Sequence, residues 1–157
     1  MPPPTAGRHA LPARVPTADD LIRLLSPERA PELKGLVLNA CRTRLIGAAI
    51  HDSLPHLAVV CWKGVVLDGA AKAFAHGFFT AIADGPEGSV SVATAFDAGR
   101  AAFLRKGYVE GDPEAYLHAR EHEHWRVKFP GRKTCVGCNP PVHGEPVLIV
   151  KGRLSSG

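Results

Sequence analysis

Two short apolar segments constrain the fold of this chain more than any other feature of its sequence. They run from Leu36 to Ala40 and from Leu57 to Trp62, and the second is apolar without interruption. Short apolar runs of this kind predict strands that are covered on both faces. Helical spacing follows each run, so the sequence predicts an α/β fold.

Helical patterns flank these two segments. Thr17 is expected to be the N-cap of the first helix, because two acids follow it and apolar residues then recur on one helical face. The predicted helices span residues 17–25, 43–53, 68–84 with Asp68 as the N-cap, a stretch opened by Ser89 or Ser91 and ended before Gly107, and 112–128. A last strand, Pro146 to Val150, is expected at the periphery of the sheet.

The domain organisation follows from these elements. Residues 1–16 contain five prolines and little apolar periodicity, which predicts a flexible N-terminal segment. Residues 17–128 form the main unit, and residues 129–157 form a loop and a terminal edge strand. So few strands make an incomplete sheet, and its open edge invites pairing with a partner chain.

The composition excludes several classes of function. With 45% hydrophobic and 22% charged residues, the 157-residue chain is typical of a soluble globular domain. Its net charge of +4 comes from scattered residues, which argues against a nucleic-acid partner. No apolar run is long enough to span a membrane. The four cysteines are too few for a disulfide framework, so we expect reduced thiols and a cytoplasmic location, with an N-terminal organelle transit segment as the alternative.

Cys41 is the leading candidate for a chemical role. It follows the first apolar run directly and precedes a helical pattern, so the sequence places it at the carboxyl end of a strand. Ligands and reactive groups gather at this edge of α/β sheets, where helix N-termini favour negative charge. A thiolate here could act as a nucleophile. The alternative is a small buried cysteine that only fills the core.

The sequence also resembles a known family. The segments LVLNACRTRLIGAAI, LAVVCWKGVVLDGAAKAFAHGFFTAIADG and SVATAFDAGRAAF, in this order, resemble the C-terminal half of a CHAT domain, a member of the caspase-like cysteine peptidases. The resemblance implies a caspase-like three-layer sandwich with an incomplete, mostly parallel sheet flanked by helices. It also implies that Cys41 is the nucleophile of an endopeptidase, that the substrate is a peptide or protein, and that no cofactor or metal takes part.

The general base of such a peptidase is missing from the sequence. In the resembled family a His-Gly pair precedes the cysteine, whereas here only His9 precedes Cys41, and alanine follows it. His76-Gly77 lies downstream within a predicted helix, and His51 and His56 lie at the far end of the helix after Cys41. We therefore expect this chain to be an incomplete or inactive peptidase. The alternative is a non-catalytic module that binds a protein partner.

Two residues are assigned to substrate binding by the resemblance. The loop after the second strand, Trp62 to Asp68, lines the substrate groove in that family, so Trp62 would form a groove wall and Asp68 would receive a basic side chain. Each has a structural alternative. Trp62 can instead pack in the core, and Asp68 can simply cap its helix.

Cys135, Cys138 and His143 form the other group that invites a test. The Cys-x-x-Cys spacing occurs in zinc sites, with His122 or His124 as a possible fourth ligand. A single cysteine pair with this histidine spacing matches no common zinc motif. We therefore predict an ordinary loop, with a zinc site and a redox-active pair as the alternatives.

Overall fold

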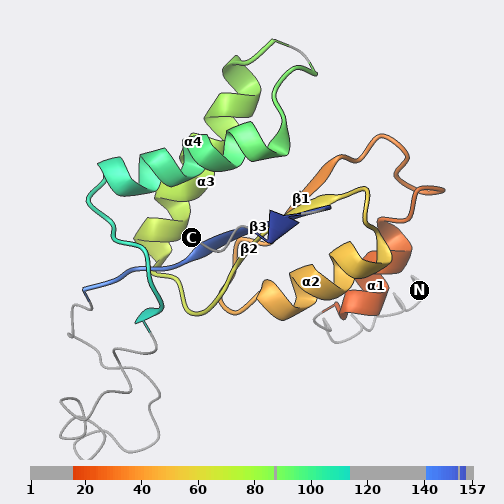
Figure 1. Ribbon diagram of the computed structural model, residues 1–157, viewed down its shortest axis with the longest axis horizontal. Coiled ribbons are helices and arrows are strands. Elements are labelled where there is room, and N and C mark those ends of the chain that lie inside the picture. Colours follow the sequence, from red (N-terminus) through yellow and green to blue (C-terminus); the bar gives the residue numbers. More distant parts are fainter. Residues whose placement is uncertain (1–15, 87, 114–140, 152, 155–157) are drawn as a thin grey trace, which may run out of the picture.

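The computed structural model describes residues 16–86, 88–113, 141–151 and 153–154. Helices lie on both sides of one sheet (Figure 1). The elements in chain order are α1 (Ala18–Leu24), β1 (Gly35–Val37), α2 (Arg44–Ser53), β2 (Ala58–Trp62), α3 (Asp68–Asp84), α4 (Val92–Arg105), β3 (Pro146–Val150) and β4 (Arg153–Leu154). This arrangement confirms the α/β class that the apolar runs predicted.

The sheet is mixed, with the order β1-β2-β3-β4. β1 and β2 are parallel, with Leu36 opposite Val59, whereas β3 is antiparallel to both β2 and β4. The expected mostly parallel sheet was therefore wrong. The chain reaches β3 from the carboxyl edge of β2, where the Lys63 N–H donates to the Glu145 carbonyl at 3.0 Å, and from that side it can only run antiparallel to β2.

β3 is an inner strand and not the terminal edge strand that the sequence indicated. It pairs with β2 on one side and with β4 on the other, and Leu148 and Ile149 are each 6% exposed. β4 was not expected. Five apolar residues near the end of a chain reveal a strand, but they do not reveal how many neighbours it has.

The alternation of side chains along β2 builds two cores. Val60 and Trp62 pack with Phe74 under α3 and α4, while Val59 and Cys61 pack on the opposite face under α2. Figure 1 shows these helices as separate layers above and below the sheet. A strand between two cores has no polar face to show, which explains the uninterrupted apolar run in the sequence.

The N-termini of the helices were predicted with mixed success. Thr17 caps α1 as expected: its hydroxyl accepts from the Asp20 N–H at 3.2 Å, and the Asp20 carboxylate accepts from the Thr17 N–H at 2.9 Å. Ser91 caps α4. Asp68 does not cap α3, because Leu67 holds the N-cap position and Asp68 is the first helical residue. The predicted 112–128 helix lies almost entirely outside the described residues, as does the segment 1–15.

The crossing of α3 and α4 depends on two glycines. A Cβ at Gly77 would lie against the Ala102 side chain and 2.7 Å from the Ala98 carbonyl oxygen. A Cβ at Gly99 would lie 2.9 Å from the Phe74 carbonyl oxygen. The two helix backbones approach closely enough at this point to exclude side chains. Gly77 is thus a packing residue.

No helix in the described part of the chain is long and apolar enough to cross a membrane.

Candidate functional site

Residues 39–43 form the turn between β1 and α2, at the carboxyl edge of the parallel strands. Cys41 lies at its centre and is exposed, as the sequence predicted. The next residue, Arg42, has φ = +56°, and it is the one non-glycine residue with positive φ among the described residues. Its N–H donates to the Gly64 carbonyl at 2.8 Å, which fastens the turn to the loop between β2 and α3. A left-handed non-glycine residue stores strain that the surrounding contacts must offset.

Asn39 connects this turn to both β2 and α3. Its Oδ1 accepts from the Trp62 indole N–H at 2.8 Å, and its Nδ2 donates to the Ala71 carbonyl at 3.5 Å. A tryptophan this deeply buried needs a partner for its only polar atom. Asn39 meets that need, so it is a structural residue of the turn.

Thr43 holds the turn from beneath, and it is the one buried polar residue in the described part of the chain, with 9% exposure. Its hydroxyl accepts from the Trp62 backbone N–H at 3.0 Å and lies 3.0 Å from the carbonyl oxygens of Leu38 and Ala40. Because the hydroxyl is used in this way, it does not cap α2. The first N–H groups of α2 are therefore left without a side-chain cap beside Cys41.

Replacing Thr43 with valine is expected to lower the free energy of unfolding by about 1–2 kcal/mol. Valine keeps the shape of threonine but leaves the buried Trp62 backbone N–H without an acceptor. The measurement is urea unfolding followed by tryptophan fluorescence. The matched variant is Thr43→Ser, which keeps the hydroxyl, and we expect it to lose less stability than Thr43→Val. Equal losses in the two variants would show that the methyl group, rather than the hydroxyl, fixes the turn.

The Cys41 thiol lies against Val66 in the loop after β2. The Val66 N–H points at Sγ with 3.4 Å between nitrogen and sulfur, and the Val66 carbonyl oxygen is 3.6 Å from Sγ. The N–H favours a thiolate, whereas the carbonyl favours a protonated thiol, so the two contacts oppose each other. The Cys41 backbone N–H has no hydrogen-bond partner among the described residues, so it is free to donate to an oxyanion.

No described histidine supplies the missing base. The His51 ring bonds to the Leu57 carbonyl through Nδ1 at 2.8 Å, at the far end of α2. His56 is exposed in the turn before β2, and His76 is exposed on α3. His9 lies outside the described residues. Within the described part of the chain, the structure brings none of these rings to Cys41.

His143 is the residue that the sequence did not connect with this edge. Its carbonyl accepts from the Leu67 N–H at 2.9 Å, one residue after the Val66 that contacts Cys41. Its imidazole turns elsewhere: Nδ1 accepts from the Val109 N–H at 2.8 Å, and the ring packs on Tyr108 with 5.4 Å between centroids. An antiparallel β3 after β2 would have been the signal, because the residues before such a strand must pass along the carboxyl end of β2.

The two residues assigned to substrate binding have different surroundings. Trp62 is 1% exposed, with its ring 5.4 Å from Phe74 and 6.2 Å from Phe103 between centroids. It packs in the core, so its ring has no surface to offer to a substrate groove. Asp68 is exposed, two residues after Val66, and so lies in the same loop region as the Cys41 thiol.

The second described cysteine differs from Cys41 in every respect. Cys61 is fully buried in β2, and burial raises the pKa of its thiol to about 11, with a smaller opposing effect from the charge of Arg44. Its thiol is therefore protonated at the pH of most assays. This makes Cys61 an internal control for any reaction at Cys41.

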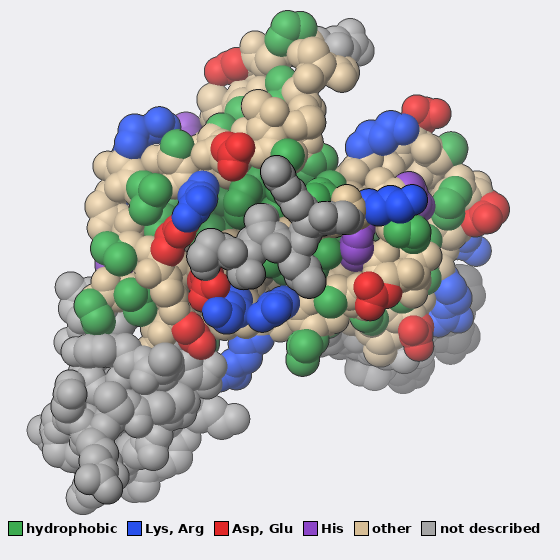
Figure 2. All heavy atoms as spheres, in the orientation of Figure 1, with side chains coloured by type: hydrophobic (Ala, Val, Ile, Leu, Met, Phe, Trp, Pro, Cys, Tyr) green, Lys and Arg blue, Asp and Glu red, His purple; other side chains and the backbone are tan. Residues whose placement is uncertain are grey.

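The described residues contain no group of three or more histidine, cysteine or acidic side chains that could hold a metal ion. Cys135 and Cys138 lie outside the described residues, so the zinc alternative is untested for them. The face in Figure 2 shows acidic and basic side chains intermixed, without a continuous basic patch.

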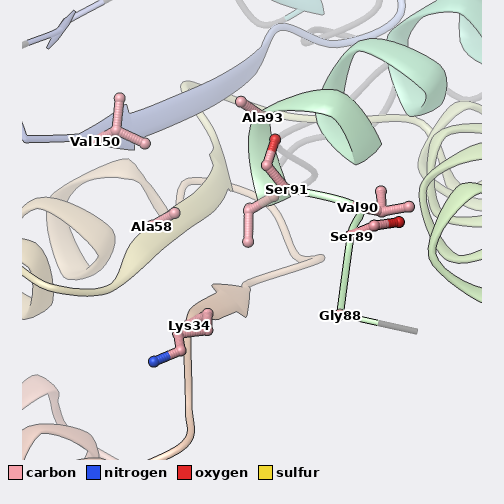
Figure 3. A pocket seen from close by; sticks show the side chains of 9 residues that line it. Lys34, Ala58, Gly88, Ser89, Val90, Ser91, Ala93 and Val150 are labelled. Atoms are coloured by element: carbon pink, nitrogen blue, oxygen red, sulfur yellow. The ribbon is translucent and has the colours of Figure 1, made fainter. Parts of the chain in front are cut away.

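A pocket of about 400 Å³ lies at the other edge of the sheet. Lys34 before β1, Ala58 at the start of β2 and Val150 at the end of β3 line it, together with the residues that lead into α4 (Figure 3). These positions mark the amino ends of the parallel strands, whereas Cys41 follows a carboxyl end. Its lining contains no cysteine, histidine or carboxylate, so the pocket is separate from the candidate site.

Comparison with known proteins finds no family model, no curated protein and no solved structure that matches this chain. The likeness to CHAT domains stays a prediction from the sequence.

Proposed function

We propose that this chain carries the nucleophile half of a caspase-like cysteine peptidase domain of CHAT type, with Cys41 as the nucleophile. The observation that supports it best is the exposed Cys41 at the carboxyl edge of the sheet, at the start of α2. Its free backbone N–H and the positive end of α2 both suit an oxyanion that forms on a carbonyl attacked by sulfur.

The chain alone does not complete the reaction in this proposal. Peptide hydrolysis needs a group that takes the thiol proton and then donates it to the leaving amine. No described histidine lies in contact with Cys41, and the opposing contacts from Val66 do not replace one. A histidine from another segment or chain would have to complete the site, so the isolated chain binds a peptide but does not turn it over.

Asp68 gives the proposal its substrate preference. The carboxylate is exposed near Val66, and no wall of hydrophobic side chains covers it. A lysine or arginine before the scissile bond would form a charge-assisted hydrogen bond with it. Trp62 has no part in this recognition because it is buried.

The test uses peptidyl electrophiles that alkylate a cysteine irreversibly, with arginine or aspartate next to the reactive carbon. Peptide mass spectrometry identifies the labelled cysteine after digestion. We expect Cys41 to react much faster than Cys61, and the arginine probe to react up to about tenfold faster than the aspartate probe. Asp68→Asn should remove this preference while Cys41 is still labelled. Peptide turnover by the isolated chain should equal that of Cys41→Ser.

Two results would overturn the proposal. Labelling of Cys41 no faster than that of buried Cys61 would show that the thiol is not available as a nucleophile. Peptide cleavage that persists in Cys41→Ser would place the chemistry at another residue.

The alternative function rests on a different observation. β1 has a strand neighbour on one side, β2. In a parallel ladder where Leu38 and Lys34 bond to β2, the backbone groups of Gly35 and Val37 point the other way. No described residue bonds to them. A non-catalytic module that binds a partner chain along this edge is the function that remains if the electrophile test fails.

A further inference from the structure

His143 joins two segments that are far apart in the sequence. Its Nδ1 accepts a hydrogen bond from the Val109 backbone N–H, with 2.8 Å between the two nitrogens. Its own N–H donates to the Val109 carbonyl at 2.9 Å, and the Gly111 N–H donates to the Gly144 carbonyl at 3.1 Å. We call this pairing of residues 109–111 with residues 142–144 the clip.

The bond to Nδ1 requires one protonation state of the imidazole. A ring nitrogen that accepts a hydrogen bond carries no proton, so the ring in this arrangement is neutral with its proton on Nε2. Adding a proton at Nδ1 would set two donors, Nδ1–H and the Val109 N–H, against each other. Histidine is the side chain that ordinarily gains this proton just below neutral pH.

We propose that the clip is a proton-sensitive fastening, which is closed while the His143 ring is neutral and opens when the ring is protonated. The clip has little else to hold it. Its backbone pairing consists of isolated bridges outside any named strand, and the Val109 side chain is 48% exposed. Its remaining support is the packing of the His143 ring on Tyr108.

Opening of the clip reaches the loop that supports Cys41. The His143 carbonyl accepts from the Leu67 N–H, and the neighbouring Val66 contacts the Cys41 sulfur. Acidification would therefore loosen the outer support of this loop while leaving the cores on both faces of β2 intact. The inference concerns the fold itself and holds whether or not Cys41 is a nucleophile.

The other titratable groups around the clip do not reproduce this response. Carboxylates titrate near pH 4 and the tyrosine near pH 10, so neither group changes its charge between pH 8 and pH 5. The charged and titratable side chains on the segments that meet at the clip are Lys63, Asp68, Arg100, Tyr108, Glu110, Asp112 and Glu145. Lys63 is paired with Glu145, and Arg100 is paired with Glu110. Acids outnumber bases in this group, so the surroundings can accept a charged ring.

The test is amide hydrogen exchange of Val109 in the full chain at pH 8 and pH 5. Each rate is divided into the rate of an unstructured peptide at the same pH to give a protection factor. We expect the protection factor of Val109 to fall at least about fivefold at pH 5, because its hydrogen bond is lost. Amides of β2 should keep their protection. The ¹⁵N shifts of the His143 imidazole should report a neutral ring protonated on Nε2 at pH 8.

The matched variant is His143→Asn. The asparagine Oδ1 is bonded to Cγ as Nδ1 is in histidine, so it can accept from the Val109 N–H, and it does not titrate. We expect the Val109 protection factor in this variant to be the same at both pH values. An equal fall in the variant and the wild type would overturn the proposal, as would an unchanged wild-type factor. A proton on Nδ1 at pH 8 would also overturn it, and that result needs no variant.

Discussion

Replacing Trp62 with alanine is expected to lower the free energy of unfolding by about 3–5 kcal/mol, which is a large part of the stability of a domain this size. The side chain is 1% exposed and its ring packs against Phe74 and Phe103. Its indole N–H also holds Asn39 at 2.8 Å, so the substitution removes both core packing and a fastening of the Cys41 turn. Urea unfolding followed by far-UV circular dichroism measures the change.

Two further variants separate these contributions. Trp62→Phe keeps an aromatic ring but removes the hydrogen bond to Asn39, and it should cost about 1–2 kcal/mol. Phe79→Ala removes an aromatic ring that is 53% exposed, so its cost should stay near or below about 1 kcal/mol. A Trp62→Ala cost no larger than that of Phe79→Ala would contradict the placement of Trp62 in the core and would return it to the surface of a groove.

Replacing Gly77 with leucine is expected to cost about 3 kcal/mol, because the new side chain must push α3 and α4 apart. Even Gly77→Ala should be destabilising, since its Cβ would meet Ala102 and the Ala98 carbonyl oxygen. This sign is the opposite of the usual result, because glycine to alanine in a helix interior ordinarily stabilises by about 1 kcal/mol. Thermal unfolding of the two variants measures the effect.

The control for Gly77 is Ala83→Leu, which adds the same side chain at an exposed position of α3. We expect it to change stability by no more than about 0.5 kcal/mol. Stabilisation by Gly77→Ala would show that the two helices do not touch at this point.

Much of the fold could be predicted because its signals are local. The apolar residues of β2 face cores on both sides, so their burial is visible as an uninterrupted run. The N-caps Thr17 and Ser91 satisfy N–H groups two or three residues later, and a contact over so short a distance leaves its mark in the sequence.

The missing parts depend on distant contacts. The direction and the inner position of β3 depend on where the chain re-enters the sheet, which no local pattern records. Asp68 matches the preferences of an N-cap, but the helix starts one residue earlier than a side-chain signal would place it. Leu67 has no capping side chain, so its role could not be read from its type.

The candidate site shows the same division. The position of Cys41 at the end of a strand was predictable, since a strand followed by a helix places the connecting residues at one edge. Its contact with Val66, the partnership of Asn39 with Trp62 and the role of Thr43 link segments about 20 residues or more apart. The sequence shows these residue types, but it does not show which of them meet.

The position of β2 in the sheet also sets the order in which the fold can assemble. Its parallel neighbour β1 is close in the sequence, whereas β3 arrives only after both long helices and everything that follows them. The α3–α4 hairpin can form from nearby residues, but the pairing of β2 with β3 must close a long loop first. Until that happens β2 is itself an edge strand, and its unpaired backbone carries the most apolar segment of the chain. The most central strand of the finished sheet is thus the one most exposed to wrong pairing during folding.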